Sequence, residues 1–132
     1  MTVVDASLVV HALAVFESPG PDAREALAAQ PIVQAPAVLK AEAISGLRGL
    51  EFRGELSEAR SLRALDMVRR LSVRSYPVDP FIDRIWELRP NLSVYDAWYV
   101  SLVEELDTDL LTTDRRLATA PGPRCSIELV GS

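Results

Sequence analysis

Short apolar stretches alternate with longer amphipathic ones along almost the whole chain, and this alternation restricts the possible folds more than any other feature. Short β-branched runs predict buried strands, and apolar residues at helical spacing predict the helices between them. Such alternation favours an α/β fold with a parallel sheet covered on both faces. The pattern predicts strands over 2–5, 30–34, 73–78, 110–112 and 126–130.

Proline, glycine and capping residues mark where the helices begin and end. Pro21 suits a first helical turn, Pro36 is expected to open the third helix, and Asp79 with Pro80 resembles an N-cap followed by a first helical residue. The predicted helices cover 8–16, 22–29, 36–53, 56–71, 79–88, 93–106 and 114–120. No linker or repeat interrupts them, so we expect a single domain over residues 1–132.

The cysteine content and the distribution of apolar residues indicate the cellular compartment. The chain has a single cysteine, Cys125, which leaves no internal disulfide and no CxxC motif and fits a reducing compartment. The apolar start lacks a basic leader and is interrupted by Asp5, so we expect no signal peptide. No apolar run reaches the ~18 residues of a membrane span. We therefore expect a cytoplasmic protein with no membrane segment.

Two acids follow predicted strands. Asp5 ends the first apolar run and Asp114 follows the run Leu110–Thr112. In open α/β sheets, ligands bind outside the carboxyl ends of the strands, where both side chains would lie. The alternative for each is an N-cap of the helix that follows.

Two further acids lie on apolar helical faces. Glu42 has Val38 and Leu39 before it and Gly46 after it at helical spacing, and the alternative is a residue at the wet edge of that face. Asp96 has only apolar or aromatic neighbours at helical spacing, although Ser93 with Asp96 also matches a capping box. In a parallel sheet the starts of such helices fall on the same edge as the strand ends.

Four carboxylates that converge on one edge repel one another, by about 4 kcal/mol for a pair at ~4 Å and an effective dielectric constant of 20. Such a cluster persists with bound cations or shared protons. Oxygen ligands select hard cations, so we expect Mg²⁺ or Mn²⁺. The chain has one histidine, His11, which lies in an apolar helix and is expected to be structural.

Four segments of the chain resemble the motifs of PIN-domain proteins in order and spacing. These are V-V-D-A-S, A-P-A-V-L-K-A-E-A-I-S-G-L-R, L-S-V-Y-D-A-W-Y-V and L-L-T-T-D-R-R-L. Order, spacing and length together resemble the VapC-type toxins of bacterial type II toxin–antitoxin pairs. The resemblance covers nearly the whole chain, apart from the variable part at 54–90.

The resemblance implies a three-layer α/β/α fold with a central parallel sheet of about five strands. It implies a metal-dependent ribonuclease, usually a homodimer, that a small antitoxin neutralises. The catalytic and metal-binding acids carry over onto Asp5, Glu42, Asp96 and Asp114, with Ser7 and Thr112 as supporting hydroxyls. In the mechanism we expect, Mg²⁺ or Mn²⁺ on three aspartates activates a water, and Glu42 binds a second metal or takes the proton.

Other readings remain open. A non-catalytic module with this fold would act only through its partner. A dehalogenase-like phosphohydrolase needs a second acid where Ser7 stands, and a dinucleotide binder needs a glycine-rich loop.

The segment Arg48–Arg74 holds seven arginines and four acids, a charge of +3 in a chain of −5. It is interpreted as an RNA-binding surface, as a solvated mixed-charge helix or as a dimer face.

Overall fold

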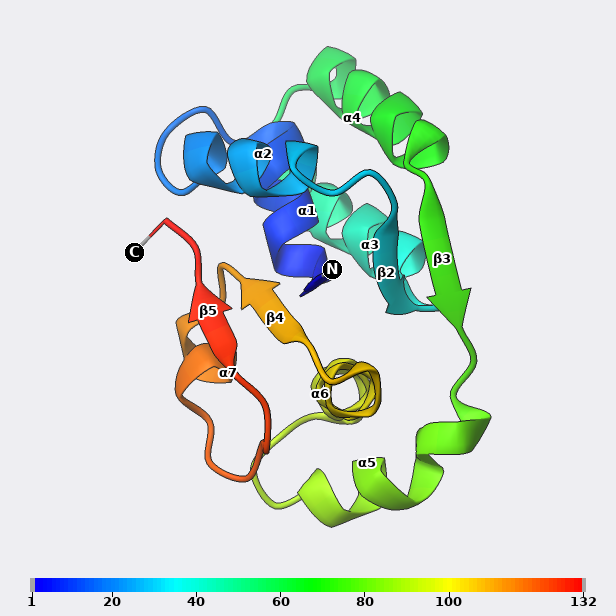
Figure 1. Ribbon diagram of the computed structural model, residues 1–132. Coiled ribbons are helices and arrows are strands. Elements are labelled where there is room, and N and C mark those ends of the chain that lie inside the picture. Colours follow the sequence, from blue (N-terminus) through cyan, green and yellow to red (C-terminus); the bar gives the residue numbers. More distant parts are fainter. Residues whose placement is uncertain (1, 132) are drawn as a thin grey trace.

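A five-stranded parallel sheet forms the centre of the computed structural model, which describes residues 2–131 (Figure 1). Met1 and Ser132, the outermost residues of the expected single domain, lie outside the described residues. The strands are β1 (Thr2–Val4), β2 (Val33–Pro36), β3 (Val73–Tyr76), β4 (Asp109–Thr112) and β5 (Ile127–Leu129), in the order β3-β2-β1-β4-β5. The predicted α/β class and parallel sheet are confirmed.

Helices cover both faces of this sheet and make the fold three-layered (Figure 1). One layer holds α1 (Ala6–Ala14), α2 (Gly20–Ala28), α3 (Leu39–Phe52) and α4 (Glu58–Arg70). The other holds α5 (Ile82–Leu88), α6 (Val94–Leu106) and α7 (Arg115–Thr119), with the short 3₁₀ helix Asp79–Phe81 before α5. No helix among residues 2–131 is both long and apolar enough to cross a bilayer.

The central strand β1 is the point where the strand order reverses. It pairs with β2 on one side, through Val3 and Gln34, and with β4 on the other, through Val3 and Leu110. The chain builds β2 and β3 outward on one side and then returns to place β4 and β5 on the other. Ligands of open α/β sheets bind at such a reversal, outside the carboxyl ends of the strands.

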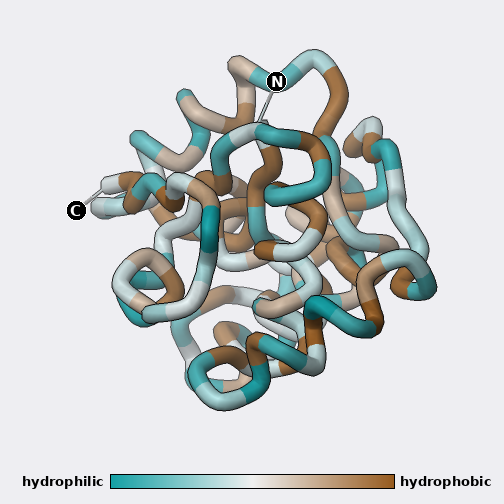
Figure 2. Tube along the Cα trace, turned by 60° about the horizontal axis from the view of Figure 1, so that its bottom comes forward, coloured by the Kyte–Doolittle hydropathy of each residue, from teal (hydrophilic) through white to brown (hydrophobic). Residues whose placement is uncertain are grey.

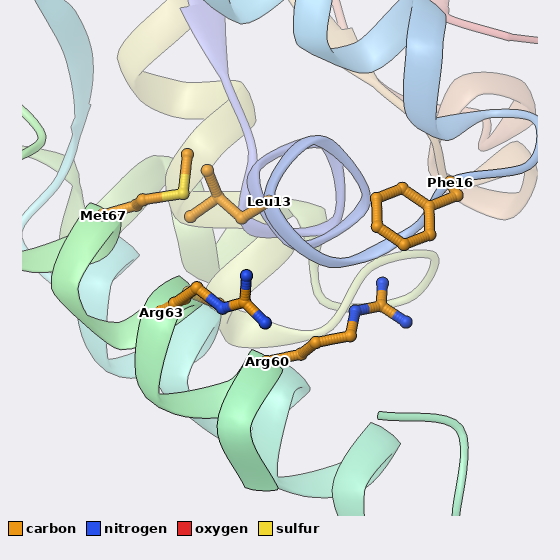
Figure 3. A pocket seen from close by; sticks show the side chains of 6 residues that line it. Leu13, Phe16, Arg60, Arg63 and Met67 are labelled. Carbon is orange, nitrogen blue, oxygen red and sulfur yellow. The ribbon is translucent and has the colours of Figure 1, made fainter. Parts of the chain in front are cut away.

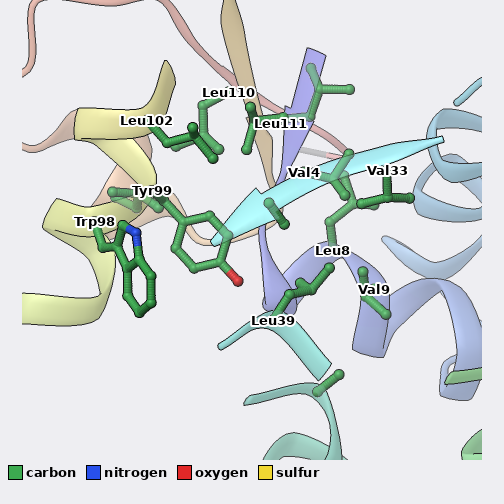
Figure 4. Packing of buried hydrophobic residues seen from close by; sticks show 14 of the residues in the cluster. Val4, Leu8, Val9, Val33, Leu39, Trp98, Tyr99, Leu102, Leu110 and Leu111 are labelled. Atoms are coloured by element: carbon green, nitrogen blue, oxygen red, sulfur yellow. The ribbon is translucent and has the colours of Figure 1, made fainter. Parts of the chain in front are cut away.

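The hydrophobic core lies between the sheet and its helices, and α6 is its most buried helix. Every residue from Ala97 to Val103 is buried, because α6 packs against β1, β2 and β4 at the middle of the sheet. Figure 4 shows Trp98, Tyr99 and Leu102 of α6 beside the strand residue Leu110. Much of the apolar sequence gathers toward the middle of the molecule in Figure 2, while hydrophilic segments lie along its outside.

Several predicted boundaries are wrong. The strand predicted over 30–34 is β2 at Val33–Pro36, and the helix predicted over 8–16 is α1 at Ala6–Ala14. Pro36 does not open the third helix: it is the last residue of β2, and α3 begins at Leu39. The proline is tolerated there because the next residue, Ala37, supplies an N–H that donates to the Tyr76 carbonyl across β3. Asp79 is not an N-cap, because it lies inside the 3₁₀ helix that precedes α5 and its side chain makes no capping bond.

Candidate active site

Asp5 follows β1 at the centre of the carboxyl edge of the sheet, and its side chain is 5% exposed. Its Oδ1 accepts hydrogen bonds from the Leu8 N–H at 3.0 Å and the Ser7 hydroxyl at 2.8 Å, while Oδ2 accepts one of 2.5 Å from the Thr112 hydroxyl. The expected N-cap of α1 is therefore present. Three donors on one buried carboxylate fix its orientation toward the edge.

Thr112 and Asp114 follow the neighbouring strand β4. The fully buried Thr112 hydroxyl donates to Asp5 and accepts the Asp114 N–H at 2.9 Å, so one side chain positions two of the acids. Asp114 Oδ1 accepts the Arg116 N–H at 2.9 Å and caps α7, as its sequence position predicts. The second Asp114 oxygen takes no part in that cap.

Glu42 lies in the first turn of α3 and points toward α6. Its Oε1 is buried and accepts no hydrogen bond from any residue in the described range. The Tyr99 hydroxyl lies beside the carboxylate, close enough to favour its charge, without completing a hydrogen bond. Figure 4 shows this hydroxyl pointing from α6 toward Leu39 of α3. The Glu42–Tyr99 pair is thus a buried polar contact with unused bonding capacity.

Asp96 lies in the first turn of α6, above the same edge. The Ser93 hydroxyl accepts the Asp96 N–H at 3.2 Å, which is one half of the expected capping box. The Asp96 carboxylate lines a cavity of about 300 Å³ together with Asn91, Asp114 and Arg116. The Arg116 guanidinium lies 3.9 Å from Asp114 and is almost fully exposed, so it adds a mobile positive charge at the rim.

Burial and the charges of neighbouring acids raise the pKa of three of the four carboxyl groups. Burial raises the pKa of Asp5; its hydrogen bonds offset part of this, and the charge of Asp96 adds to it. Burial also raises the pKa of Glu42, and Asp96 and Asp5 push it further. Burial raises the pKa of Asp96, as does the charge of Asp114, while Arg116 opposes the shift. The four carboxylates therefore form one electrostatically linked group.

The donor set matches a hard divalent cation in chemistry. Carboxylate oxygens are the ligands that Mg²⁺ and Mn²⁺ prefer, and a cation would offset the repulsion and occupy the unpartnered Glu42 oxygen. Among residues 2–131, however, no three His, Cys, Asp or Glu side chains are grouped closely enough to hold a metal ion by themselves. The arrangement fits a cation that also keeps water or substrate oxygens, as Mg²⁺ usually does.

Two residues that the sequence did not single out as site residues extend the hydrogen-bond network. The Thr113 N–H and hydroxyl both donate to Ser7 Oγ, at 3.3 and 3.0 Å, and His11 Nδ1 lies 2.7 Å from the Thr113 hydroxyl. Burial lowers the pKa of His11. His11 stands one helical turn after Ser7, which was the only signal in the sequence that the two share a face.

Comparison with known proteins gives a consistent family. The sequence matches the PIN domain over residues 2–123. It is 45% identical to ribonuclease VapC9 of Mycobacterium tuberculosis over 130 residues, which is 98% of each chain.

Solved structures match the fold at lower sequence identity. The crystal structure of PAE2754 from Pyrobaculum aerophilum has a TM-score of 0.69 at 22% identity and covers 96% of this chain and 81% of that one. The structure of Mycobacterium tuberculosis VapC20, described as a Sarcin-Ricin loop cleaving toxin, has a TM-score of 0.66 at 16% identity. It covers 89% of this chain and 92% of that one.

Proposed function

Because the chain belongs to the PIN-domain family and to its VapC ribonucleases, we propose that it is a divalent-metal-dependent endoribonuclease whose site is formed by Asp5, Glu42, Asp96 and Asp114. One observation supports this proposal most: Asp5, Glu42 and Asp96 lie near the point where the strand order reverses, and burial together with the charges of neighbouring acids raises the pKa of all three. Burying carboxylates near one another costs free energy of folding, and such arrangements are typical of functional sites that need negative charge.

The aspartates Asp5, Asp96 and Asp114 would hold Mg²⁺ or Mn²⁺. When bound, the cation supplies a Lewis acid for a phosphate oxygen and a more acidic water. The residues of the chain do the remaining work. Thr112 and Ser7 keep Asp5 oriented, since both donate to it. Glu42, whose pKa burial raises, is a better proton acceptor than an exposed carboxylate and is suited to take a proton from the attacking water.

The test is cleavage of total cellular RNA by the purified protein with Mg²⁺ or Mn²⁺, followed by mapping of new 5′ ends. Asp5→Asn and Asp96→Asn should each lower cleavage by about 100-fold or more, because each removes a charge from the site without changing its shape. The matched control is Asp66→Asn, which neutralises an acid on the exposed surface of α4. Normal cleavage by the site variants, or by wild type in EDTA, would contradict the proposal.

We further propose that the protein is the toxin of a toxin–antitoxin pair in the cytoplasm and works as a homodimer. This rests on the likeness to VapC proteins and on exposed apolar side chains such as Phe52, Leu62 and Met67. Growth arrest on expression, relieved by co-expression of an adjacent small gene, would test the pairing. Light scattering of the purified protein would give its oligomeric state.

The second candidate is a non-catalytic module that acts only through its partner. The raised pKa values of three acids argue against it, since a module with no metal has no use for buried repulsion. Calorimetric titration with Mn²⁺ separates the two functions. Binding by wild type that is lost in Asp96→Asn supports the enzyme, and no binding by either supports the module.

A further inference from the structure

A chain of three hydrogen bonds connects His11 on α1 to the carboxylate of Asp5. His11 Nδ1 lies 2.7 Å from the Thr113 hydroxyl, in the loop that follows β4. The Thr113 hydroxyl donates to Ser7 Oγ at 3.0 Å, and the Ser7 hydroxyl donates to Asp5 Oδ1 at 2.8 Å. A half-buried imidazole is thus in indirect contact with the acid at the centre of the site.

The directions of these hydrogen bonds determine the tautomer of His11. A hydroxyl has one hydrogen to donate. Ser7 gives its hydrogen to Asp5, so Ser7 Oγ is an acceptor toward Thr113, whose N–H and hydroxyl both donate to it. The Thr113 hydrogen is thereby used, and toward His11 the Thr113 oxygen accepts. The hydrogen of that bond is therefore on Nδ1 of His11.

The charge state of the ring agrees with this assignment. Burial lowers the pKa of His11, so the neutral ring predominates at neutral pH. A neutral imidazole carries one N–H, and the contact with Thr113 places it on Nδ1 and leaves Nε2 as the acceptor nitrogen. His11 thus acts as a donor toward the acid site without adding a positive charge to it.

All three hydrogens of this chain point toward Asp5. Hydrogen bonds that run in one direction polarise one another, which strengthens the last bond of the chain, from Ser7 to Asp5. The Nδ1–H also keeps the Thr113 hydroxyl turned toward Ser7, because it occupies the oxygen on the other side. Without that donor, Thr113 is able to turn its hydrogen elsewhere, and the Ser7 hydroxyl loses one of the two groups that orient it.

We propose that His11 is a positioning residue of the acid site, which acts on Asp5 through Thr113 and Ser7. This inference rests on the proposed ribonuclease function, in which a fixed Asp5 carboxylate holds the cation. Groups that orient a metal-binding side chain contribute to metal affinity and activity, and their loss costs about 10–100-fold. A histidine that only packs α1 against the loop after β4 would affect stability and leave the cation site unchanged.

The first experiment observes the tautomer directly, in the ¹⁵N NMR spectrum of the tag-free full chain in EDTA near neutral pH. His11 is the only histidine of the chain, so its ring gives the only imidazole signals. We expect the chemical shift of a protonated nitrogen for Nδ1 and that of an unprotonated nitrogen for Nε2. The reverse assignment would overturn the inference, because Thr113 would then donate to His11 and not to Ser7.

The second experiment measures Mn²⁺ affinity by calorimetry and RNA cleavage at saturating Mn²⁺. His11→Leu removes the donor and should weaken Mn²⁺ binding about 10-fold and lower kcat, with KM for RNA unchanged. His11→Asn should restore most of the wild-type affinity, because its amide N–H takes the place of Nδ1–H. Equal losses in the two variants would show that the donor has no role.

The control and the cycle use other threonines. Thr119→Val removes a hydroxyl that donates to the Arg115 carbonyl on α7, outside the chain, and should leave Mn²⁺ affinity and kcat unchanged. Thr113→Val removes the middle of the chain, so in that background His11→Leu should change affinity by less than about 2-fold. Losses that simply add would overturn the inference, because His11 would then act without Thr113. Circular dichroism checks the fold of each variant.

The outcomes separate this inference from the proposed function. If wild type neither binds Mn²⁺ nor cleaves RNA, the ribonuclease proposal fails, and the positioning role fails with it. If wild type does both and His11→Leu matches it in Mn²⁺ affinity and kcat, the enzyme stands and the positioning role is overturned. A lower melting temperature of His11→Leu with unchanged affinity and kcat would leave His11 with a packing role alone.

Discussion

The Thr112 hydroxyl donates a 2.5 Å hydrogen bond to the Asp5 carboxylate, across 107 positions of sequence. The same oxygen accepts the N–H of Asp114. One hydroxyl thus joins the ends of β1 and β4 and sets the relative position of two acids. Loss of the Thr112 hydroxyl should therefore affect both the stability of the fold and the geometry of the site.

Replacement of Thr112 by valine keeps the volume and removes the hydroxyl. Since Thr112 is fully buried, we expect a loss of about 1–3 kcal/mol in the free energy of unfolding, because Asp5 Oδ2 and the Asp114 N–H lose a partner. The pKa of Asp5 should rise further, and the acid limb of the pH–rate profile should move to higher pH. Urea denaturation and RNA cleavage across pH check both effects. Thr112→Ser, which keeps the hydroxyl, should restore the wild-type profile; equal behaviour of the two variants would count against the role of the bond.

The raised pKa values predict an unusual pH dependence of stability. In the metal-free protein Asp5, Glu42 and Asp96 bind protons more tightly when folded than when unfolded, so their contribution to stability is greatest at low pH and falls as pH rises through the folded pKa values. Glu42→Gln should flatten that fall, because one titrating group is gone. Melting temperatures of wild type and Glu42→Gln in EDTA between about pH 5 and pH 8 give the comparison. A wild-type curve that runs parallel to that of the variant would show that burial and the neighbouring charges do not raise the pKa of Glu42.

Addition of Mn²⁺ at neutral pH should reverse the loss, because a ligand that binds only the folded state stabilises it. We expect Mn²⁺ to raise the melting temperature of wild type and to leave that of Asp96→Asn unchanged. Asp83→Asn, on α5 and outside the acid group, should respond like wild type. Equal responses of Asp96→Asn and wild type would show that the cation binds elsewhere.

Tyr99 and Tyr76 allow a comparison between a tyrosine hydroxyl without a hydrogen-bond partner and one that donates a hydrogen bond. The Tyr99 side chain is 1% exposed and its hydroxyl has no hydrogen-bond partner in the described residues, so Tyr99→Phe should leave stability unchanged or raise it by about 1 kcal/mol in EDTA. The Tyr76 hydroxyl donates to Gln34 Oε1, so Tyr76→Phe should lower stability by about 1 kcal/mol. Chemical denaturation measures both. A large loss in Tyr99→Phe would show that the hydroxyl is bonded in solution.

Far from the acids, Glu104 on α6 ties α5 to the turn before β5. It accepts two hydrogen bonds from Arg84, at 2.8 and 3.0 Å, and the Arg124 N–H at 2.7 Å. Burial alone would raise the pKa of Glu104, but these donors outweigh it and lower the pKa. This contribution to stability is present above the unfolded pKa and is lost as pH falls through the folded one.

Glu104→Gln should therefore lower the free energy of unfolding at neutral pH by about 1–3 kcal/mol. The control is Asp66→Asn, which breaks two exposed pairs with Arg69 and Arg70 and should change stability by about 0–1 kcal/mol. Urea denaturation at pH 7 gives the free energy of unfolding of both variants, so that the two losses can be compared. Similar losses in the two would mean that burial adds nothing to the Glu104 contacts.

The sequence predicted the sheet and the position of the acids because both follow from local rules. Asp5 and Asp114 come directly after apolar strands, and Ser93 and Asp96 form a recognisable start of a helix. Parallel strands share one carboxyl edge, so Asp5 and Asp114 lie at the same edge of the sheet. Their role in catalysis remains a proposal that the variants above test.

What the sequence could not predict depends on contacts between distant elements. Nothing near Glu42 shows that Tyr99 lies beside it, and nothing near Ser7 shows that Thr113 donates to it. The helix boundary at Pro36 failed because pairing with β3 extended the strand beyond its local preference. The arginines of 48–74 have different surroundings in the fold: Arg60 and Arg63 line a hollow between α1 and α4 (Figure 3), whereas Arg69 and Arg70 pair with Asp66.

The order β3-β2-β1-β4-β5 also has a consequence for biosynthesis. The first three strands and Glu42 leave the ribosome early, but the neighbour of β1 on its other side, together with Asp114, is translated near the end. A nascent polypeptide therefore carries an incomplete set of acids until its last segment emerges. Under the proposed ribonuclease function, each unfinished copy would therefore be inactive on RNA.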